Sequence, residues 1–217
     1  MKYNDILLTQ LLGPILTCST PSISHAASVS DLLISEIMAN PSAVSDTNGE
    51  WFELFNPTDS SINLSGITLS DAGSNSYVIS SGSDLWIDSG NYFVMARNGS
   101  RLNNGGFTAD YVYSNFILGN SSDQIIFSDG LNELLRFDYE PGFVANGASM
   151  ELLSESMLAG NYAASMSTYG AGDFGSPGAE GAYAFSVTPS PVPLPGAFWL
   201  FGSGLLGLTG LMRRKSA

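Results

Sequence analysis

The segment GEWFELFNP, residues 49–57, carries the clearest structural signal in the chain. If the segment is extended, Trp51 and Glu53 lie on one face and Phe52 lies on the other, because successive side chains of a strand alternate. Apolar residues therefore occupy both faces, and we expect both faces of this strand to be covered. Pro57 has no N–H group to donate to a neighbouring strand, so the strand ends before it.

The preceding segment LLISEIM, residues 32–38, has the composition of a second strand. Between the two strands lies DTNG, residues 46–49, and its Asn-Gly pair is typical of the positive φ angles of tight hairpin turns. We therefore expect a hairpin turn at residues 46–49, with the two strands antiparallel.

Seven further short runs rich in β-branched and aromatic residues follow, each bounded by Gly, Asn, Asp or Ser. They start at residues 62 (INLSGITL), 76 (SYVIS), 92 (YFVMA), 111 (YVYS), 124 (QIIF), 133 (ELLRFDY) and 149 (SMELL). Short strands separated by turn residues predict an all-β sandwich. No sustained period of 3.6 residues is present, so we expect little helix, and no internal repeat is visible.

The charge is strongly acidic and unevenly distributed. Of 217 residues, 20 are Asp or Glu and 7 are Lys or Arg, which gives a formal net charge of −13. Outside the terminal segments the basic residues are Arg97, Arg101 and Arg136. Such a surface repels phosphate backbones, which argues against nucleic-acid binding. It is compatible with divalent cations, basic partners and neutral glycans, and equally with an acidic surface that only keeps an exported domain in solution.

The first 26 residues have the features of a signal peptide. One lysine precedes an apolar stretch at residues 6–16, and small residues precede a cleavage site between Ala26 and Ala27. A disordered or amphipathic arm is the alternative. Cleavage would remove Cys18 and His25, the single Cys and the single His of the chain.

The last 26 residues combine a proline motif, an apolar run and a basic end. Residues 197–212 carry no charge, and at about 1.5 Å per residue they would form a short membrane helix of about 24 Å. Basic residues at the end favour the cytoplasmic side. A linker, residues 181–191, precedes this segment. The residues of the segment that matter here are Val192, Pro193, Leu194, Pro195, Trp199, Arg213, Arg214 and Lys215.

This order of features resembles the PEP-CTERM sorting signal of Gram-negative bacteria, although Leu194 stands where that family has Glu. The resemblance implies recognition by an exosortase-type processing enzyme and transient anchoring in the inner membrane. Delivery to the cell surface or extracellular polymer matrix would follow. The alternative is an ordinary single-pass anchor that holds a periplasmic domain permanently.

The middle of the chain, residues 30–180, resembles the lamin tail domain of exported bacterial proteins. The resemblance is carried, in order, by ISEIMANP (34–41), GEWFELFNP (49–57), INLSGITLSD (62–71), LWIDSGNYFVMAR (85–97), LGNSSDQIIFSDG (118–130) and GDFGSPG (172–178). It implies an immunoglobulin-like β-sandwich.

Without a mature His or Cys, the chain could form neither a Ser-His-Asp triad nor a His/Cys zinc site, so carboxylates are the remaining chemical groups. Oxygen-rich loops can hold Ca²⁺, and we consider one speculative calcium site with no other cofactor. Its candidate ligands are Glu36, Asp46, Asn48, Glu50, Glu53 and Asp71. The complete spacing of a calcium loop is absent, and a plain hairpin turn is the alternative for residues 46–49.

These observations favour a noncatalytic exported protein with a structural or adhesive role. Extracellular polysaccharide or surface proteins are the expected partners, in addition to the processing enzyme and the inner membrane. A polysaccharide hydrolase that uses a carboxylate pair such as Glu36 and Glu53 is the less favoured alternative, because no local signature selects a pair.

Overall fold

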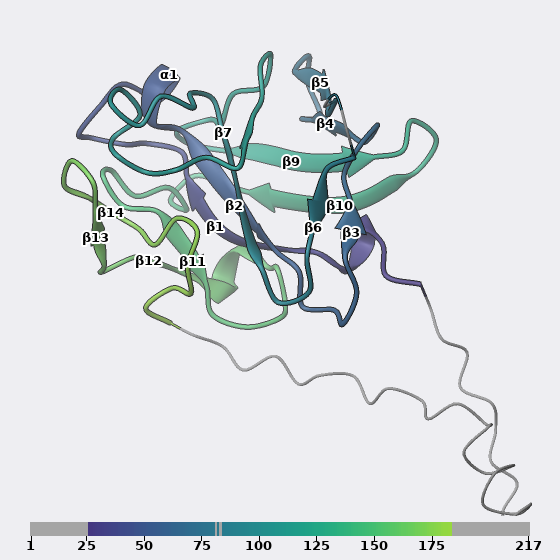
Figure 1. The fold of residues 1–217 in the computed structure, drawn as a ribbon. Coiled ribbons are helices and arrows are strands. Elements are labelled where there is room, and N and C mark those ends of the chain that lie inside the picture. Colours follow the sequence, from purple (N-terminus) through teal and green to yellow (C-terminus); the bar gives the residue numbers. More distant parts are fainter. Residues whose placement is uncertain (1–25, 81, 83, 184–217) are drawn as a thin grey trace, which may run out of the picture. The chain divides into compact units, whose positions relative to one another are not determined.

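The computed structural model describes residues 26–80, 82 and 84–183, which form a β-rich fold (Figure 1). Helix in this part of the chain is limited to the 3₁₀ turns η1 (Val29–Asp31) and η2 (Ala159–Asn161) and to the four-residue α1 (Asp46–Gly49). The expectation of little helix is confirmed. None of these helical turns has the length and apolar character needed to cross a membrane.

The described residues form fourteen strands, and each of the nine expected strands is among them. They are β1 (Leu33–Met38), β2 (Trp51–Phe55), β3 (Ile62–Asn63), β4 (Thr68–Ser70), β5 (Ser76–Val78), β6 (Trp86–Ile87), β7 (Tyr92–Ala96), β8 (Tyr111–Val112), β9 (Asp123–Ser128), β10 (Glu133–Tyr139), β11 (Met150–Leu152), β12 (Tyr162–Ala164), β13 (Thr168–Tyr169) and β14 (Asp173–Phe174). The run from residue 62 is divided into β3 and β4 near Gly66, whose φ is +82°. β6 and β12 to β14, which are two or three residues long, are not among the expected strands.

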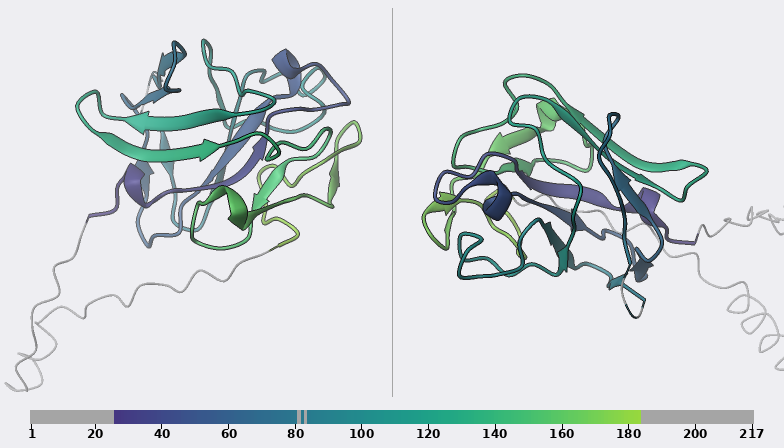
Figure 2. Two further views of the ribbon diagram at one scale, coloured as in Figure 1. Left: turned by 180° about the vertical axis from the view of Figure 1, so that it is seen from behind. Right: turned by 90° about the horizontal axis from the view of Figure 1, so that it is seen from above.

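Two larger sheets make up most of the fold. One has the strand order β12-β11-β1-β2-β7-β8, and the other has the order β10-β9-β4-β5. All pairs are antiparallel except β7 with β8. The short pairs β3–β6 and β13–β14 stand apart from both. Figure 2 shows the β9–β10 hairpin crossing one face of the larger sheet.

The core lies between these two sheets. On β2, Phe52 is opposite Ile37 of β1 and Met95 of β7, and all three side chains are buried. The ring centroids of Phe52 and of Phe127, on β9 of the other sheet, are 6.1 Å apart. This packing gives the two-layer, mostly β architecture that an immunoglobulin-like sandwich requires.

The opposite face of β2 is covered as well, as expected from its two apolar faces. Trp51 is buried in a second cluster with Met38, Val94 and Phe107, and Tyr169 of β13 packs against this cluster. The indole N–H of Trp51 donates to the Tyr169 hydroxyl at 3.1 Å. The segment after β12 therefore covers the outer face of the larger sheet.

One local expectation is wrong. β1 and β2 are antiparallel, but residues 46–49 form the helical turn α1 instead of a hairpin turn, and none of them has a positive φ angle. The connection from Met38 to Trp51 is long enough to include a helical turn, so it does not need a tight hairpin. Gly49 is required for another reason: a Cβ atom there would lie 2.5 Å from the side chain of Val44.

Candidate functional site

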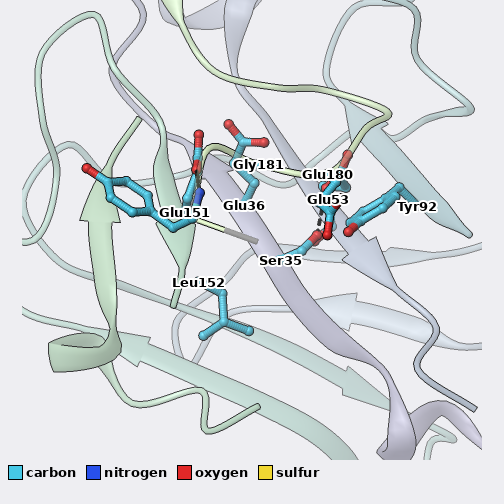
Figure 3. A pocket seen from close by; sticks show the side chains of 9 residues that line it. Ser35, Glu36, Glu53, Tyr92, Glu151, Leu152, Glu180 and Gly181 are labelled. Atoms are coloured by element: carbon cyan, nitrogen blue, oxygen red, sulfur yellow. Dashed lines mark hydrogen bonds between the residues drawn. The ribbon is translucent and has the colours of Figure 1, made fainter. Parts of the chain in front are cut away.

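Three glutamates form a row across the outer face of the larger sheet. Glu36 on β1 lies directly opposite Glu53 on β2 and Glu151 on β11. Each side chain is at most 2% exposed. Figure 3 shows the three residues lining one cavity. Two of them, Glu36 and Glu53, are candidate residues from the sequence.

The row is buried because residues 175–183, which we call the strap, cross it. The strap's Ser176 N–H donates to Glu36 Oε1 at 2.9 Å, and its Gly178 N–H donates to Glu53 Oε2 at 2.6 Å. The N–H of Tyr183 donates to Glu151 Oε2 at 3.3 Å. Each glutamate of the row therefore holds a different backbone N–H of the strap.

Side-chain hydroxyls complete the contacts of two of the glutamates. Ser176 Oγ donates to Glu36 Oε2 at 2.8 Å, and Ser149 Oγ donates to Glu36 Oε1. Ser35 Oγ donates to Glu53 Oε1 at 2.7 Å. Glu36 and Glu53 thus serve as acceptors for neighbouring serines as well as for the strap.

Glycines allow the strap backbone to approach the carboxylates. A Cβ atom on Gly181 would lie 2.5 Å from Glu151 Oε2, and a Cβ atom on Gly175 would lie 3.0 Å from Glu36 Oε1. Gly178 has a φ of +85°, a region that other residues rarely adopt. Glycines at these positions therefore allow the strap backbone to lie close to the glutamate row.

A small cavity remains under the strap. Its volume is about 20 Å³, and its walls include the three glutamates, Tyr92 of β7 and Glu180 of the strap. Glu151 Oε1 is buried and has no hydrogen-bond partner among the residues that the structure describes. A cavity of this size has room for a water molecule and is much too small for a sugar ring.

Burial makes it costly for these carboxylates to ionise. It raises the pKa of Glu36 from 4.5 to about 7, against the opposing effect of the hydrogen bonds from Ser149 and Ser176. Burial, and after it the charge of Glu36, raises the pKa of Glu53 well above its usual range. Glu36 and Glu53 are therefore poised to hold protons near neutral pH.

The other candidate ligands lie elsewhere and are engaged with other partners. Glu50 Oε2 accepts from Arg97 at 2.9 Å and from the N–H of Leu118 at 3.2 Å. Burial raises the pKa of Glu50 to about 7, while the charge of Arg97 acts in the opposite direction. In α1, Asp46 accepts from Asn120, and Asn48 accepts from Asn98, both at 2.8 Å.

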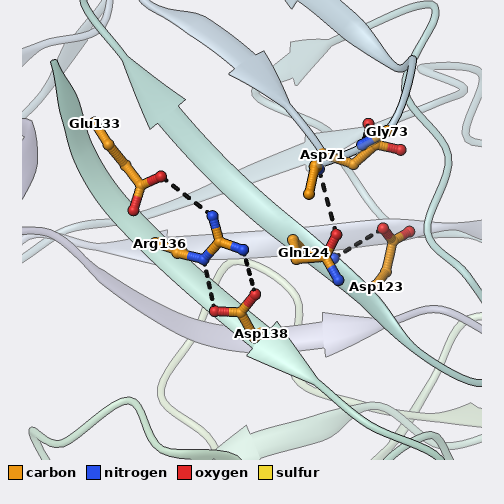
Figure 4. A network of polar contacts seen from close by, with 8 residues as sticks. Asp71, Gly73, Asp123, Gln124, Glu133, Arg136 and Asp138 are labelled. Carbon is orange, nitrogen blue, oxygen red and sulfur yellow. Dashed lines mark hydrogen bonds and ion pairs between the residues drawn. The ribbon is translucent and has the colours of Figure 1, made fainter.

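Asp71 lies at the β4–β5 turn in the smaller sheet, near Gly73 and Gln124 (Figure 4). It accepts from the N–H groups of Gly73 at 2.8 Å and Asn75 at 3.0 Å. The six candidate calcium ligands are thus not brought together in one place. In the part of the chain that the structure describes, no group of three acidic, His or Cys side chains is arranged to hold a metal ion.

The comparisons agree with the fold. A sequence model of the Lamin Tail Domain family matches residues 25–140, more than half of the chain. The chain belongs to this family. No curated protein and no solved structure gives a significant match.

The lamin tail domain described here continues beyond the matched residues. β11 pairs with β1 and β12 pairs with β11, so residues after 140 complete the larger sheet. Glu151 and the strap, both outside the match, meet Glu36 and Glu53 inside it. The glutamate row is therefore assembled from both ends of the domain.

The sequence did not identify Glu151 or Ser176 as site residues. Glu151 follows a methionine in the SMELL run, and its position opposite Glu36 depends on the register of two strands far apart in the chain. The GDFGSPG motif, residues 172–178, was the available signal for the strap, but a motif does not show which surface it covers.

The sorting-signal residues named above, from 192 to 217, lie outside the described residues. At its N-terminal end, the lamin tail domain is described by the structure from Ala26 onward. Ala26 is exposed, whereas Ala27 packs against the core.

Proposed function

We propose that this protein is a noncatalytic, exported structural or adhesive protein, sorted by an exosortase-type enzyme to the cell surface or extracellular polymer matrix. Membership of the lamin tail domain family supports a binding or structural domain. The noncatalytic part of the proposal rests on the contacts of the strap. Glu36 and Glu53, the carboxylate pair considered for hydrolysis, are buried and accept hydrogen bonds from backbone N–H groups of the strap.

The export part rests on the sequence of the two ends. The first 26 residues have the order of a signal peptide. The segment 192–217 has the order of a PEP-CTERM signal, with Pro193 and Pro195 before the apolar run and Arg213 after it. Together these features support export of the lamin tail domain and transient insertion of the C-terminal segment into the inner membrane.

The charge distribution indicates the kind of partner. The three arginines of the described chain are already engaged: Arg97 with Glu50, Arg136 with Asp138 at 2.7 Å, and Arg101 with the carbonyl of Gly106 at 3.0 Å. The surface presents mainly acidic and neutral groups. We expect it to contact neutral polysaccharide or basic surface proteins and to bind no nucleic acid.

The test of sorting follows a tagged full chain in its native host and in a strain without the processing enzyme. The wild-type strain should release a form that lacks the basic end, and the mutant strain should keep the full chain in the inner membrane. Full-length, membrane-bound protein in both strains would contradict sorting and support a permanent periplasmic anchor.

To test whether the protein is noncatalytic, the purified protein is incubated with candidate polysaccharides and new reducing ends are measured. We expect none. Turnover that is lost in either Glu36→Gln or Glu53→Gln, but kept in the surface variant Glu140→Gln, would show that the domain is a hydrolase.

A further inference from the structure

The glutamate row has no basic partner in the described chain. The titratable groups that face it come from every neighbouring element: Tyr92 on β7, Asp110 before β8, Tyr169 on β13, and Glu180 and Tyr183 on the strap. All of them are neutral or acidic. The acids are also not arranged as a group of three that could share a metal ion, within the residues that the structure describes.

Three ionised carboxylates in register on adjacent strands would repel one another strongly in such a buried setting. A proton is the compensating charge that this arrangement accommodates, because a protonated carboxyl still accepts a hydrogen bond from a backbone N–H. If the strap moves away, water reaches the carboxylates and ionisation becomes favourable. Strap closure and proton binding are therefore linked.

We infer that the strap, residues 175–183, is a proton-dependent closure that stays on the sheet while Glu36 and Glu53 are protonated and opens as they ionise. The strap is held through three of its backbone N–H groups, each of which donates to a glutamate on a different strand. The strap follows β14 and contributes no strand to a sheet, so its opening does not require any sheet strand to leave its place.

The direction follows from the pKa of Glu36, which burial raises from 4.5 to about 7 while the strap is closed. Between these values the closed state binds more protons than the open state, so closure is favoured at low pH and loses that advantage as the pH rises through 7. If the open state returns to 4.5, Glu36 alone makes opening about 70-fold more favourable at pH 8 than at pH 5. Glu53 acts in the same direction.

Opening would also lengthen the connection to the C-terminal segment. The strap residues, once extended, add about 30 Å of chain. This consequence rests on the proposed anchoring, whereas the strap's response to pH does not. Failure of sorting and failure of the proton dependence are therefore separate results.

The experiment measures hydrogen exchange of the full chain in a nonionic detergent at pH 5 to pH 8, corrected for intrinsic exchange. The amides of Ser176, Gly178 and Tyr183 are compared with the core amide of Phe127. We expect the strap amides to lose at least about 70-fold protection from pH 5 to pH 8 and to exchange faster than Phe127 at pH 8.

Three variants make the test decisive. Glu36→Gln, which mimics the protonated acid, should weaken the pH dependence of the strap amides, and Glu140→Gln, at an exposed position, should leave it intact. Gly178→Ala should open the strap at every pH while Phe127 stays protected, because Gly178 has a φ of +85° that alanine rarely adopts. The inference is overturned if strap and core amides exchange together at every pH, or if Glu36→Gln responds to pH as the wild type does.

Discussion

Replacing Tyr169 with Phe is expected to destabilise the domain by about 1–3 kcal/mol, the usual cost of leaving a buried donor without its acceptor. Tyr169 accepts the indole N–H of Trp51 at 3.1 Å, and Trp51 is completely buried. The phenyl ring remains in the variant, so its edge-on packing against the indole, with ring centroids 5.9 Å apart, is kept. The loss therefore reports the hydrogen bond.

A double-mutant cycle with Trp51→Phe isolates this bond. Once the indole donor is gone, Tyr169→Phe should cost close to nothing, and the coupling between the two positions should be about 1 kcal/mol or more. Urea denaturation followed by circular dichroism measures all four proteins. An equal cost of Tyr169→Phe in both backgrounds would refute the claim that the hydrogen bond between Trp51 and Tyr169 stabilises the domain.

Three further results are expected. The free energy of unfolding should fall from pH 5 to pH 8, by at most about 2–3 kcal/mol from Glu36, because its pKa is raised from 4.5 to about 7 and the folded state loses its extra proton over this range. Urea titrations of the wild type and of Glu36→Gln measure this change, and greater stability of the wild type at pH 8 would contradict it. Arg97→Ala should lower the free energy of unfolding by about 2–3 kcal/mol at pH 8 and by less at pH 5, where Glu50 is protonated. The control Arg101→Ala, on the exposed loop, should change it by less than about 0.5 kcal/mol in the same assay. The melting temperature should be the same in millimolar Ca²⁺ and in chelator, and a rise of several degrees in Ca²⁺ would reveal a calcium site that the proposal does not include.

Much of the fold could be predicted from the sequence because the strands leave a local signal. The GEWFELFNP segment has apolar residues on both faces, and the structure covers both, one with the core around Phe52 and the other with the cluster around Trp51. The sequence of residues 46–49 alone could not show whether they form a hairpin turn. Asn-Gly suits such a turn, but the length of the connection also allowed a helical turn.

The candidate site was only partly accessible to the same reasoning. Glu36 and Glu53 stood out because both lie within strands, yet a carboxylate in a strand is usually exposed, and nothing in its neighbours shows that another segment covers it. The cover comes from the strap, and the third glutamate, Glu151, enters through pairing between β1 and β11. Register and long-range contacts of this kind are properties of the folded chain and not of any short segment.

The central claim is that the lamin tail domain is exported and released from a C-terminal membrane signal. Intact mass spectrometry of the protein recovered separately from the membrane and extracellular fractions of its native host tests this most directly. We expect an extracellular form that begins near Ala27 and ends near Pro195. Recovery of only a membrane-bound form that retains Arg213 to Ala217 would contradict it.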